Sequence, residues 1–474
     1  MSQTVVEGDT LRPTTDDARL EQSVTAIVDS LWRNELDELI SYPSICTGNP
    51  AQDTAVTACR NRIIALFTAA GVPAEAWTIA AGGRTATPLV HGRTPPRPDL
   101  PTVLLYAHYD VQPVPDHGKG WDTPPFTATD KPDGADVRKY GRGAADDKSG
   151  VIMHLATARA FQDTGPPVNL KVLVEGEEET GFGTLEAYLA DPASDKSRFR
   201  ADVVVVADTG NVALGVPTLT TTLRGYAVFD VAVRTLDSAV HSGQYGGPAP
   251  DAFMALVRLL ADLHTDTGDV AVPGLARDHH RLDPVDPDAF AAAAGVRRGV
   301  PLVGTGGLAH RLADHPSLNV IGLHGVDTSD RPGNVLCPAA AARVSVRLAP
   351  DEDPEQARRR VEDFLVDRRP WGITPAVTFL GAGPGFTAPT TGPRFAAAKQ
   401  ALATAFATPA VFAGQGGSVP LVRLLQEVNP EAAFVLWGCE EPRARIHGTN
   451  ESVSKAELTR MSLAQTAFLK NLTQ

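Results

Sequence analysis

The sequence has few cysteines, no long apolar run and no excess of basic charge, and each absence excludes a class of protein. Its four cysteines (Cys46, Cys59, Cys337 and Cys439) lie far apart without a CxxC spacing, which argues against a disulfide framework and a cysteine zinc site. No apolar run reaches membrane-spanning length. A net charge of −13 disfavours binding to nucleic acid or to an anionic membrane. The first residues lack the basic and apolar regions of a secretory signal, so we expect a cytoplasmic protein.

The chain of 474 residues is too long for one hydrophobic core, and its first half alternates predicted strands with predicted helices. This order predicts an α/β domain with a mostly parallel sheet that is covered by helices on both faces. Ligands of such sheets bind beyond the carboxyl ends of the strands. The predicted strands are Val103–Tyr106, Leu170–Val174 and Val203–Val206, and the predicted helices are Leu20–Leu39, Asp53–Ala70 and Lys148–Gln162.

The pattern changes near Pro217. A long strand or hairpin over Leu219–Arg234 is followed by a predicted helix, two strands and a second helix, which ends at Arg368. This β-α-β-β-α-β order predicts an inserted α+β two-layer domain of ferredoxin-like type. We place the inserted domain at residues 217–383 and the larger domain at 1–216 with 384–474.

Five short motifs carry polar side chains, and most of them follow a predicted strand. In Tyr106-Ala107-His108-Tyr109-Asp110, residues i and i+2 share a face, so Asp110 can orient His108. In the glycine-rich turn Gly141-Arg142-Gly143-Ala144-Ala145-Asp146-Asp147, adjacent carboxylates are costly unless a cation neutralises them. Asp147 also suits the N-cap of the following helix, so we expect one aspartate to bind metal and the other to fix the turn.

The other three motifs extend this set. Four glutamates stand between Glu175 and Glu179; the dipole of a helical first turn would account for about two of them. Asp208 closes an apolar strand and His447 lies near the C-terminus, and each alone is more often a turn or surface residue. Together, two histidines, two aspartates and one glutamate can supply a dinuclear metal site, and a second glutamate remains as a general base.

The motifs HYD, GRGAADDKSG, EGEEETG, ADTG and HGTNE, in this order, resemble the M20 metallopeptidases, and YAHYDVQPVPD is most similar to their carnosinase-type dipeptidase branch. The resemblance implies two zinc ions. It assigns Asp146 as the bridging ligand, with His108 and Asp208 on one ion and Glu179 and His447 on the other.

The resemblance also assigns residues around this metal pair. Glu178 matches the general base, Asp110 matches the partner of His108, and the Asp146–Asp147 peptide is expected to be cis. The larger domain would be the catalytic domain.

In the inserted domain, the resemblance implies a lid that also forms a homodimer. His241 matches a histidine that stabilises the oxyanion across the dimer interface, and Arg347 matches an arginine that binds the substrate carboxylate. Asn334, Gly417 and Ser418 match further substrate-binding positions.

Three functions remain open at this stage. The favoured one is hydrolysis of dipeptides with a free carboxylate, and a second is deacylation of N-acyl amino acids by the same site. A non-catalytic metal-binding protein is the third, and retention of Glu178 weighs against it. Manganese or cobalt would suit the carboxylate-rich ligand set as well as zinc. No P-loop, dinucleotide fingerprint or nucleophile elbow is present.

Overall fold

The computed structural model describes residues 15–49, 51–114, 118–417 and 419–473. The chain forms two compact units. Unit 1 comprises residues 1–219, 390–410 and 428–474, and unit 2 comprises residues 220–389 and 411–427. The sequence prediction placed the borders at 217 and 383 and left residues 411–427 in the larger domain. The segment 411–427 belongs to unit 2, because its strand β18 (Val411–Gln415) pairs with β10 (Thr218–Leu223), most of which lies at the start of that unit.

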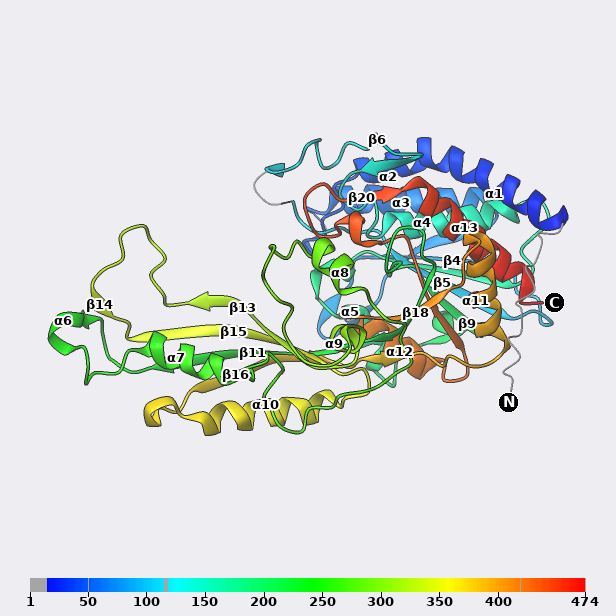
Figure 1. The fold of residues 1–474 in the computed structure, drawn as a ribbon. Coiled ribbons are helices and arrows are strands. Elements are labelled where there is room, and N and C mark those ends of the chain that lie inside the picture. The colour runs from blue at the N-terminus through cyan, green and yellow to red at the C-terminus, as the bar shows by residue number, and fades with distance from the viewer. Residues whose placement is uncertain (1–14, 50, 115–117, 418, 474) are drawn as a thin grey trace, which may run out of the picture. The chain divides into compact units, whose positions relative to one another are not determined.

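Unit 1 is built on a sheet whose strands run in the order β1-β4-β8-β5-β9-β19 (Figure 1). Strands β8, β5, β9 and β19 are mutually parallel, and β4 and β1 are added antiparallel at one edge. All four residues of β9 and nearly all of β5 are buried, as expected for strands covered on both faces. The strands are β1 (Ala74–Trp77), β4 (Leu89–Arg93), β5 (Thr102–His108), β8 (Asn169–Glu175), β9 (Val203–Val206) and β19 (Ala433–Leu436).

Helices of unit 1 pack on this sheet and on one another. α4 lies on β5 and α11 on β19, while α13 packs against α4, α11 and α1. The helices are α1 (Thr15–Arg33), α2 (Glu35–Ser41), α3 (Thr54–Ala69), α4 (Lys148–Ala160), α5 (Thr184–Ala190), α11 (Pro393–Phe406) and α13 (Lys455–Asn471). Two short sheets complete the unit: β2 (Ala80–Ala81) with β3 (Arg84–Thr85), and β6 (Thr129–Asp133), β7 (Asp136–Tyr140) and β20 (Ser452–Ser454).

The helix predicted over Leu20–Leu39 is two helices in the structure, α1 and α2, which meet at Asn34. The side-chain amide of Asn34 donates to the carbonyl oxygen of Ser30. Side chains that hydrogen-bond the local backbone in this way compete with helix continuation. Apolar periodicity continued through this point and therefore did not reveal the break.

Unit 2 contains an antiparallel sheet in the order β13-β15-β11-β16 (Figure 1). With α7 and α10 on the sheet, the chain order β11-α7-β13-β15-α10-β16 confirms the predicted ferredoxin-like arrangement. The segment Leu219–Arg234 is two strands, β10 and β11, separated at Arg224. The elements are β11 (Gly225–Arg234), α7 (Ala252–Ala261), β13 (Ser317–His324), β15 (Ala339–Leu348), α10 (Pro354–Arg368) and β16 (Ala376–Gly383).

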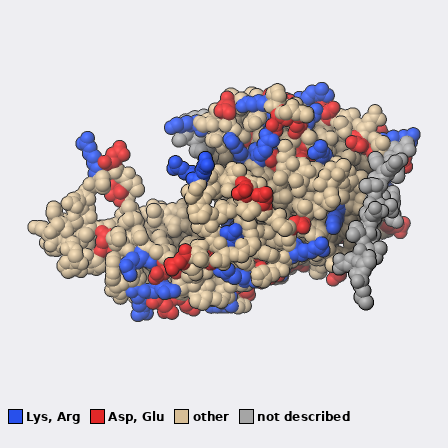
Figure 2. All heavy atoms as spheres, viewed as in Figure 1, with Lys and Arg blue, Asp and Glu red and all other residues tan. Residues whose placement is uncertain are grey.

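The core of unit 2 lies between this sheet and its two helices. Val361 and Leu365 of α10 pack with Phe229 and Val344 of the sheet, so the apolar stripe of α10 covers its own sheet as the sequence predicted. The opposite face of α10 carries acidic and basic side chains side by side, including the pair Arg358–Glu355 (Figure 2).

Several shorter elements lie outside the four-stranded sheet. They are β10 (Thr218–Leu223), β17 (Phe386–Thr387), β18 (Val411–Gln415), β12 (Val240–His241), β14 (Val335–Leu336), α6 (Ser242–Tyr245), α8 (Pro287–Ala293), α9 (Leu308–Ala313) and α12 (Pro420–Val428). Over the described residues, no helix combines the length and apolar character that crossing a bilayer requires. The four cysteines are free, as their spacing predicted.

Candidate metal centre

The polar residues of unit 1 meet where the parallel strands end. His108, the last residue of β5, lies beside Glu175, the last residue of β8. Asp208 follows β9 by two residues, and β9 runs parallel to β5. Parallel strands present their carboxyl ends at one edge, so short segments after each strand bring these side chains together.

Asp146 lies between two histidines that are far apart in the sequence. Its Oδ1 lies 2.9 Å from Nε2 of His108, and its Oδ2 lies 2.9 Å from Nε2 of His447. Each histidine meets a second carboxylate: Nε2 of His108 is 3.7 Å from Oδ1 of Asp208, and Nε2 of His447 is 3.2 Å from Oε2 of Glu179. The structure thus brings all five predicted ligands into two groups that share Asp146.

These donor atoms suit a pair of divalent cations. Ligand atoms around a tetrahedral zinc ion lie about 3.3 Å apart, given bonds of about 2.0–2.2 Å, and the observed separations are close to this spacing. Among the described residues, no lysine or arginine forms an ion pair with Asp146, Glu179 or Asp208. A carboxylate cluster without basic partners is stabilised by bound cations.

The pKa values of the cluster reflect this excess of negative charge. Burial alone would lower the pKa of His108, but hydrogen bonds to Asp110, Asp146 and Asp208 outweigh it and raise the pKa. Hydrogen bonds to Asp146 and Glu179 raise the pKa of His447 to about 10. The neighbouring carboxylates therefore favour a positive charge at both imidazoles, carried either by a proton or by a bound metal ion.

Asp110 connects the ends of β5 and β8. Its carbonyl oxygen lies 3.1 Å from Nδ1 of His108, which directs Nε2 of that ring toward Asp146. Its carboxylate accepts hydrogen bonds from the backbone amides of Glu178 and Glu179, at 3.2 and 3.0 Å. Asp110 thus orients the histidine mainly through its backbone and holds the glutamate turn through its side chain.

Asp147 has the structural role that its sequence context predicted. Its carboxylate accepts from the backbone amide of Gly150 at 3.0 Å and so caps α4, and it also accepts from the backbone amide of His108. The Asp146–Asp147 peptide bond is cis, as the resemblance implied. By these contacts Asp147 faces backbone amides, while Asp146 faces the two histidines.

Glu178 begins the short 3-10 turn Glu178–Thr180, beside the candidate ligand Glu179. Burial, and after it the negative charge of Asp208, raises the pKa of Glu178 well above its usual range. A carboxylate with a raised pKa holds a proton more readily, which suits a group that accepts a proton and then returns it.

Sequence reasoning missed Glu451, which holds the turn that carries Asp146. Fully buried, its carboxylate accepts from the guanidinium of Arg142 at 2.8 Å and from the backbone amides of Gly143, Ala145 and Asp146 at 3.0 to 3.1 Å. The HGTNE motif contained this residue. The glycine-rich turn before Asp147 was the signal that could have identified Glu451. Its backbone amides and the side chain of Arg142 need an acceptor when they are buried.

Glu440 was also missed. It lies four residues after the end of β19, and burial followed by the charges of Asp146 and Asp208 raises its pKa well above the usual range. Its Oε1 is buried without a hydrogen-bond partner. Glu179 has the same spacing from the end of β8, so the strand-end reasoning applied to the other carboxylates could have found Glu440.

The residues predicted to bind substrate in unit 2 fall into two separate groups. His241 and Asn334 lie at the tip that carries β12 and β14 (Figure 1): the backbone carbonyl of Asn334 accepts from the amide of Ser242, next to His241. Arg347 lies near the other end of β15. Arg347 is eight positions along the strand from Ala339, a distance of about 27 Å.

Arg347 has a second arginine beside it that the sequence did not reveal. Burial, and then the positive charge of Arg347, lowers the pKa of Arg224 to about 10. Arg224 donates to the carbonyl oxygen of Gly416 at 3.3 Å, which places the loop containing Gly417 in the same region. Two neighbouring guanidinium groups favour an anionic ligand such as a carboxylate. The remaining predicted position, Ser418, lies outside the described residues.

Comparison with known proteins supplies the context for this site. The family model described as "Peptidase family M20/M25/M40" matches residues 104–471. A cysteinylglycine-S-conjugate dipeptidase of Corynebacterium striatum is 38% identical over 378 residues, which are 78% of this chain and 81% of the relative. The human Beta-Ala-His dipeptidase is 29% identical over 377 residues, which are 76% of this chain and 72% of that protein.

Two solved structures share the fold. Human carnosine dipeptidase 1 superposes with a TM-score of 0.80 at 23% identity, covering 98% of this chain and 100% of that one. The dipeptidase Dug1p of Saccharomyces cerevisiae gives a TM-score of 0.79 at 21% identity, covering 96% of this chain and 98% of that one.

Proposed function

The chain belongs to the peptidase family M20/M25/M40, and on this premise we propose that it is a dinuclear zinc dipeptidase for substrates with a free C-terminal carboxylate. One observation carries the proposal: the two oxygens of Asp146 each lie 2.9 Å from the Nε2 atom of a different histidine. A carboxylate in this position is suited to bridge two metal ions.

In this proposal His108 and Asp208 would hold one zinc ion, Glu179 and His447 would hold the other, and Asp146, which belongs to both groups, would contribute to both. Bound divalent cations would lower the pKa of a coordinated water and polarise the scissile carbonyl. Two imidazole nitrogens in the ligand set favour zinc, although manganese and cobalt accept the same ligands.

Glu178 is the proposed general base. It takes the proton from the attacking water and delivers it to the leaving amine, so the substrate loses its amide bond and gains one water. The raised pKa of Glu178 supports this role because the carboxylate must be protonated for part of the cycle. Asp110 keeps the Nε2 atom of His108 directed toward Asp146.

Arg347 is proposed to bind the C-terminal carboxylate of the substrate, with Arg224 adding to the positive potential. Asn334, Gly417 and Ser418 are proposed as further contacts. His241 is proposed to stabilise the oxyanion of the tetrahedral intermediate, where a fixed hydrogen-bond donor has its largest effect.

We propose a homodimer through unit 2, and the separation of His241 and Arg347 within one subunit supports it. A strand length of about 27 Å prevents both residues of one subunit from contacting one dipeptide, so His241 would act on the site of the partner. Support for such an interface comes from the edge strand β13, where Val320, Ile321 and Leu323 are largely exposed. Exposed apolar side chains on an edge strand are typical of an interaction surface.

The experiment that tests the function is turnover of a substrate panel by chelated protein that has been reloaded with zinc, manganese or cobalt. We expect hydrolysis of Cys-Gly, of its S-conjugates or of β-Ala-His, and loss of turnover for the same peptides with an amidated C-terminus. Preferential cleavage of N-acetyl or N-succinyl amino acids would instead establish the deacylase. Equal turnover of amidated peptides would contradict carboxylate recognition.

A further inference from the structure

Unit 2 contains a second cluster of potential metal ligands that the catalytic proposal does not use. It joins three segments: Asp278 and His280 from the irregular stretch after α7, Asp314 after α9, and Asp351 after β15. One carboxylate oxygen from Asp278, one from Asp351 and one ring nitrogen of His280 lie within 4.8 Å of one another.

Asp314 fixes the orientation of His280. Fully buried, it lies with Oδ1 3.0 Å from Nδ1 of His280 and accepts from the backbone amide of His280 through Oδ2, also at 3.0 Å. A carboxylate on one ring nitrogen leaves the other nitrogen available as a metal ligand, an arrangement common behind metal-binding histidines. The other nitrogen, Nε2, lies 3.2 Å from Oδ2 of Asp351.

The two carboxylates of the cluster are held in place as well. Oδ1 of Asp351 accepts from the hydroxyl of Thr387 at 2.8 Å, and Oδ2 of Asp278 accepts from the backbone amide of Asp351 at 3.1 Å. The backbone amide of Asp278 donates to the carbonyl oxygen of Asp314. Each ligand is therefore oriented by a hydrogen bond from a different part of unit 2.

The charge of the cluster is not balanced by basic side chains. Within the described ranges, Asp278, Asp314 and Asp351 form no ion pair with a lysine or arginine, and their only ionic partners are His280 and His310. Three carboxylates around one imidazole resemble the catalytic group, where His447 lies 3.2 Å from Glu179. The 3.2 Å separation of His280 and Asp351 likewise matches the spacing of about 3.3 Å between tetrahedral zinc ligands.

We propose that Asp278, His280 and Asp351 form a structural site for a divalent transition-metal cation such as Zn²⁺, separate from the catalytic pair. The imidazole nitrogen favours such a cation over Mg²⁺ or Ca²⁺, which take oxygen ligands. Water completes the coordination. The cation ties the stretch 278–314 to the end of β15, and it binds with release of any proton held on Nε2 of His280.

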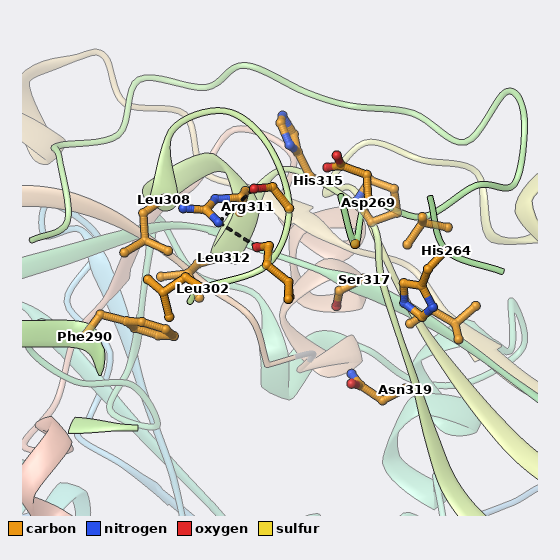
Figure 3. Close-up of a pocket in the computed structure, with 16 residues that line it drawn as sticks. His264, Asp269, Phe290, Leu302, Leu308, Arg311, Leu312, His315, Ser317 and Asn319 are labelled. Carbon is orange, nitrogen blue, oxygen red and sulfur yellow. Dashed lines mark hydrogen bonds between the residues drawn. The ribbon is translucent and has the colours of Figure 1, made fainter. Parts of the chain in front are cut away.

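The stretch 278–314 contributes to a cavity wall, and a bound cation would help to keep this stretch in place. Its residues form much of the wall of a cavity of about 480 Å³ (Figure 3), including Phe290, Leu302 and Arg311. Arg311 donates to the carbonyl oxygens of Val303 and Gly304, so the wall is held on one side by local hydrogen bonds. The proposed cation would add an attachment at residues 278 and 280, on the chain segment that leads into this wall.

The test is the zinc content of the full-length protein after equilibration with Zn²⁺ and removal of excess metal. His280→Gln should contain one zinc ion fewer per subunit than the unsubstituted protein. The matched control is His279→Gln: His279 is exposed and contacts the rings of His310 and His315, and its substitution should leave the zinc content unchanged. Asp351→Asn, at an exposed side chain, provides a second variant in case His280→Gln fails to fold.

A second measurement tests whether the cation restricts opening of the stretch 278–314. Trypsin cleavage at the exposed Arg281, Arg297 and Arg298 should accelerate roughly tenfold in His280→Gln or Asp351→Asn at saturating zinc, because opening of the stretch no longer costs the binding free energy of the cation. Equal zinc contents would overturn the proposal and leave the contacts of His280 with Asp314 and Asp351 as hydrogen bonds without a metal. Because dipeptide turnover is not the readout, this outcome is independent of the catalytic proposal.

Discussion

The Nε2 atom of His447 lies 2.9 Å from Oδ2 of Asp146, which joins the last motif of the chain to the turn that opens α4. Neither residue is recognisable as a ligand by itself. Their contact, together with the equivalent contact of His108 on the other oxygen of Asp146, is the feature from which the proposed chemistry follows.

Glu178→Gln should retain the metal content of the unsubstituted protein but lower kcat by about 10²–10⁴-fold, because the amide cannot accept the proton of the attacking water. Metal analysis and steady-state kinetics on Cys-Gly would measure both quantities. The control is Glu177→Gln in the same turn, whose oxygen can still accept from the amide of Thr87 and which should stay within about tenfold. Near-normal turnover by Glu178→Gln would rule out this residue as the base.

Glu451→Gln should lower the free energy of unfolding by about 3 kcal/mol, because it leaves the buried guanidinium of Arg142 without its ion pair. Urea denaturation would measure the change. The exposed pair Arg423–Glu427 offers the comparison: Glu427→Gln should cost less than about 1 kcal/mol. Similar losses for the two variants would show that the buried pair has no special role in the turn.

His91 predicts a dependence of stability on pH. Burial, and then Arg198, lowers the pKa of His91 to about 4, whereas its ordinary value is 6.5. The folded chain therefore binds fewer protons than the unfolded chain between these values. The contribution of His91 should be complete above pH 6.5 and decline as the pH falls toward 4, by about 3 kcal/mol in total.

Urea denaturation at several pH values would test this dependence. His91→Asn should flatten the decline between pH 6.5 and 4, since asparagine does not titrate, while the oxygen of asparagine can still accept from Arg198. His324→Asn, at an exposed position of β13, should reproduce the original pH profile. A profile for His91→Asn parallel to that of the unsubstituted protein would contradict the prediction.

Mixed dimers test whether His241 acts on the partner. His241→Ala and Arg347→Ala homodimers should each be nearly inactive. A heterodimer of the two variants contains one site with Arg347 from its own subunit and His241 from the other, so about half of the original activity should return. Purification through two different affinity tags would isolate this species. If His241 acted within its own subunit, both sites would lack one residue and no activity would return.

The sequence by itself determined the features that depend on local order. Apolar runs predicted β5, β8 and β9, and the order of strands and helices predicted the α/β class of the larger domain and the α+β class of the inserted one. Polar residues directly after strands predicted where the proposed ligands lie. These inferences succeed because periodicity and strand direction are properties of short segments. The five proposed metal ligands lie in such segments, and the structure brings them together.

Only the tertiary structure decided which distant residues meet. The buried contacts of Glu451 with the turn at Asp146, the position of Glu440 and the pairing of Arg224 with Arg347 have no local signature. The same holds for the cluster around His280 and for the separation of His241 from Arg347 along β15. Side-chain contacts between distant segments depend on how whole elements pack, and packing is set by the sum of many weak interactions rather than by any single motif.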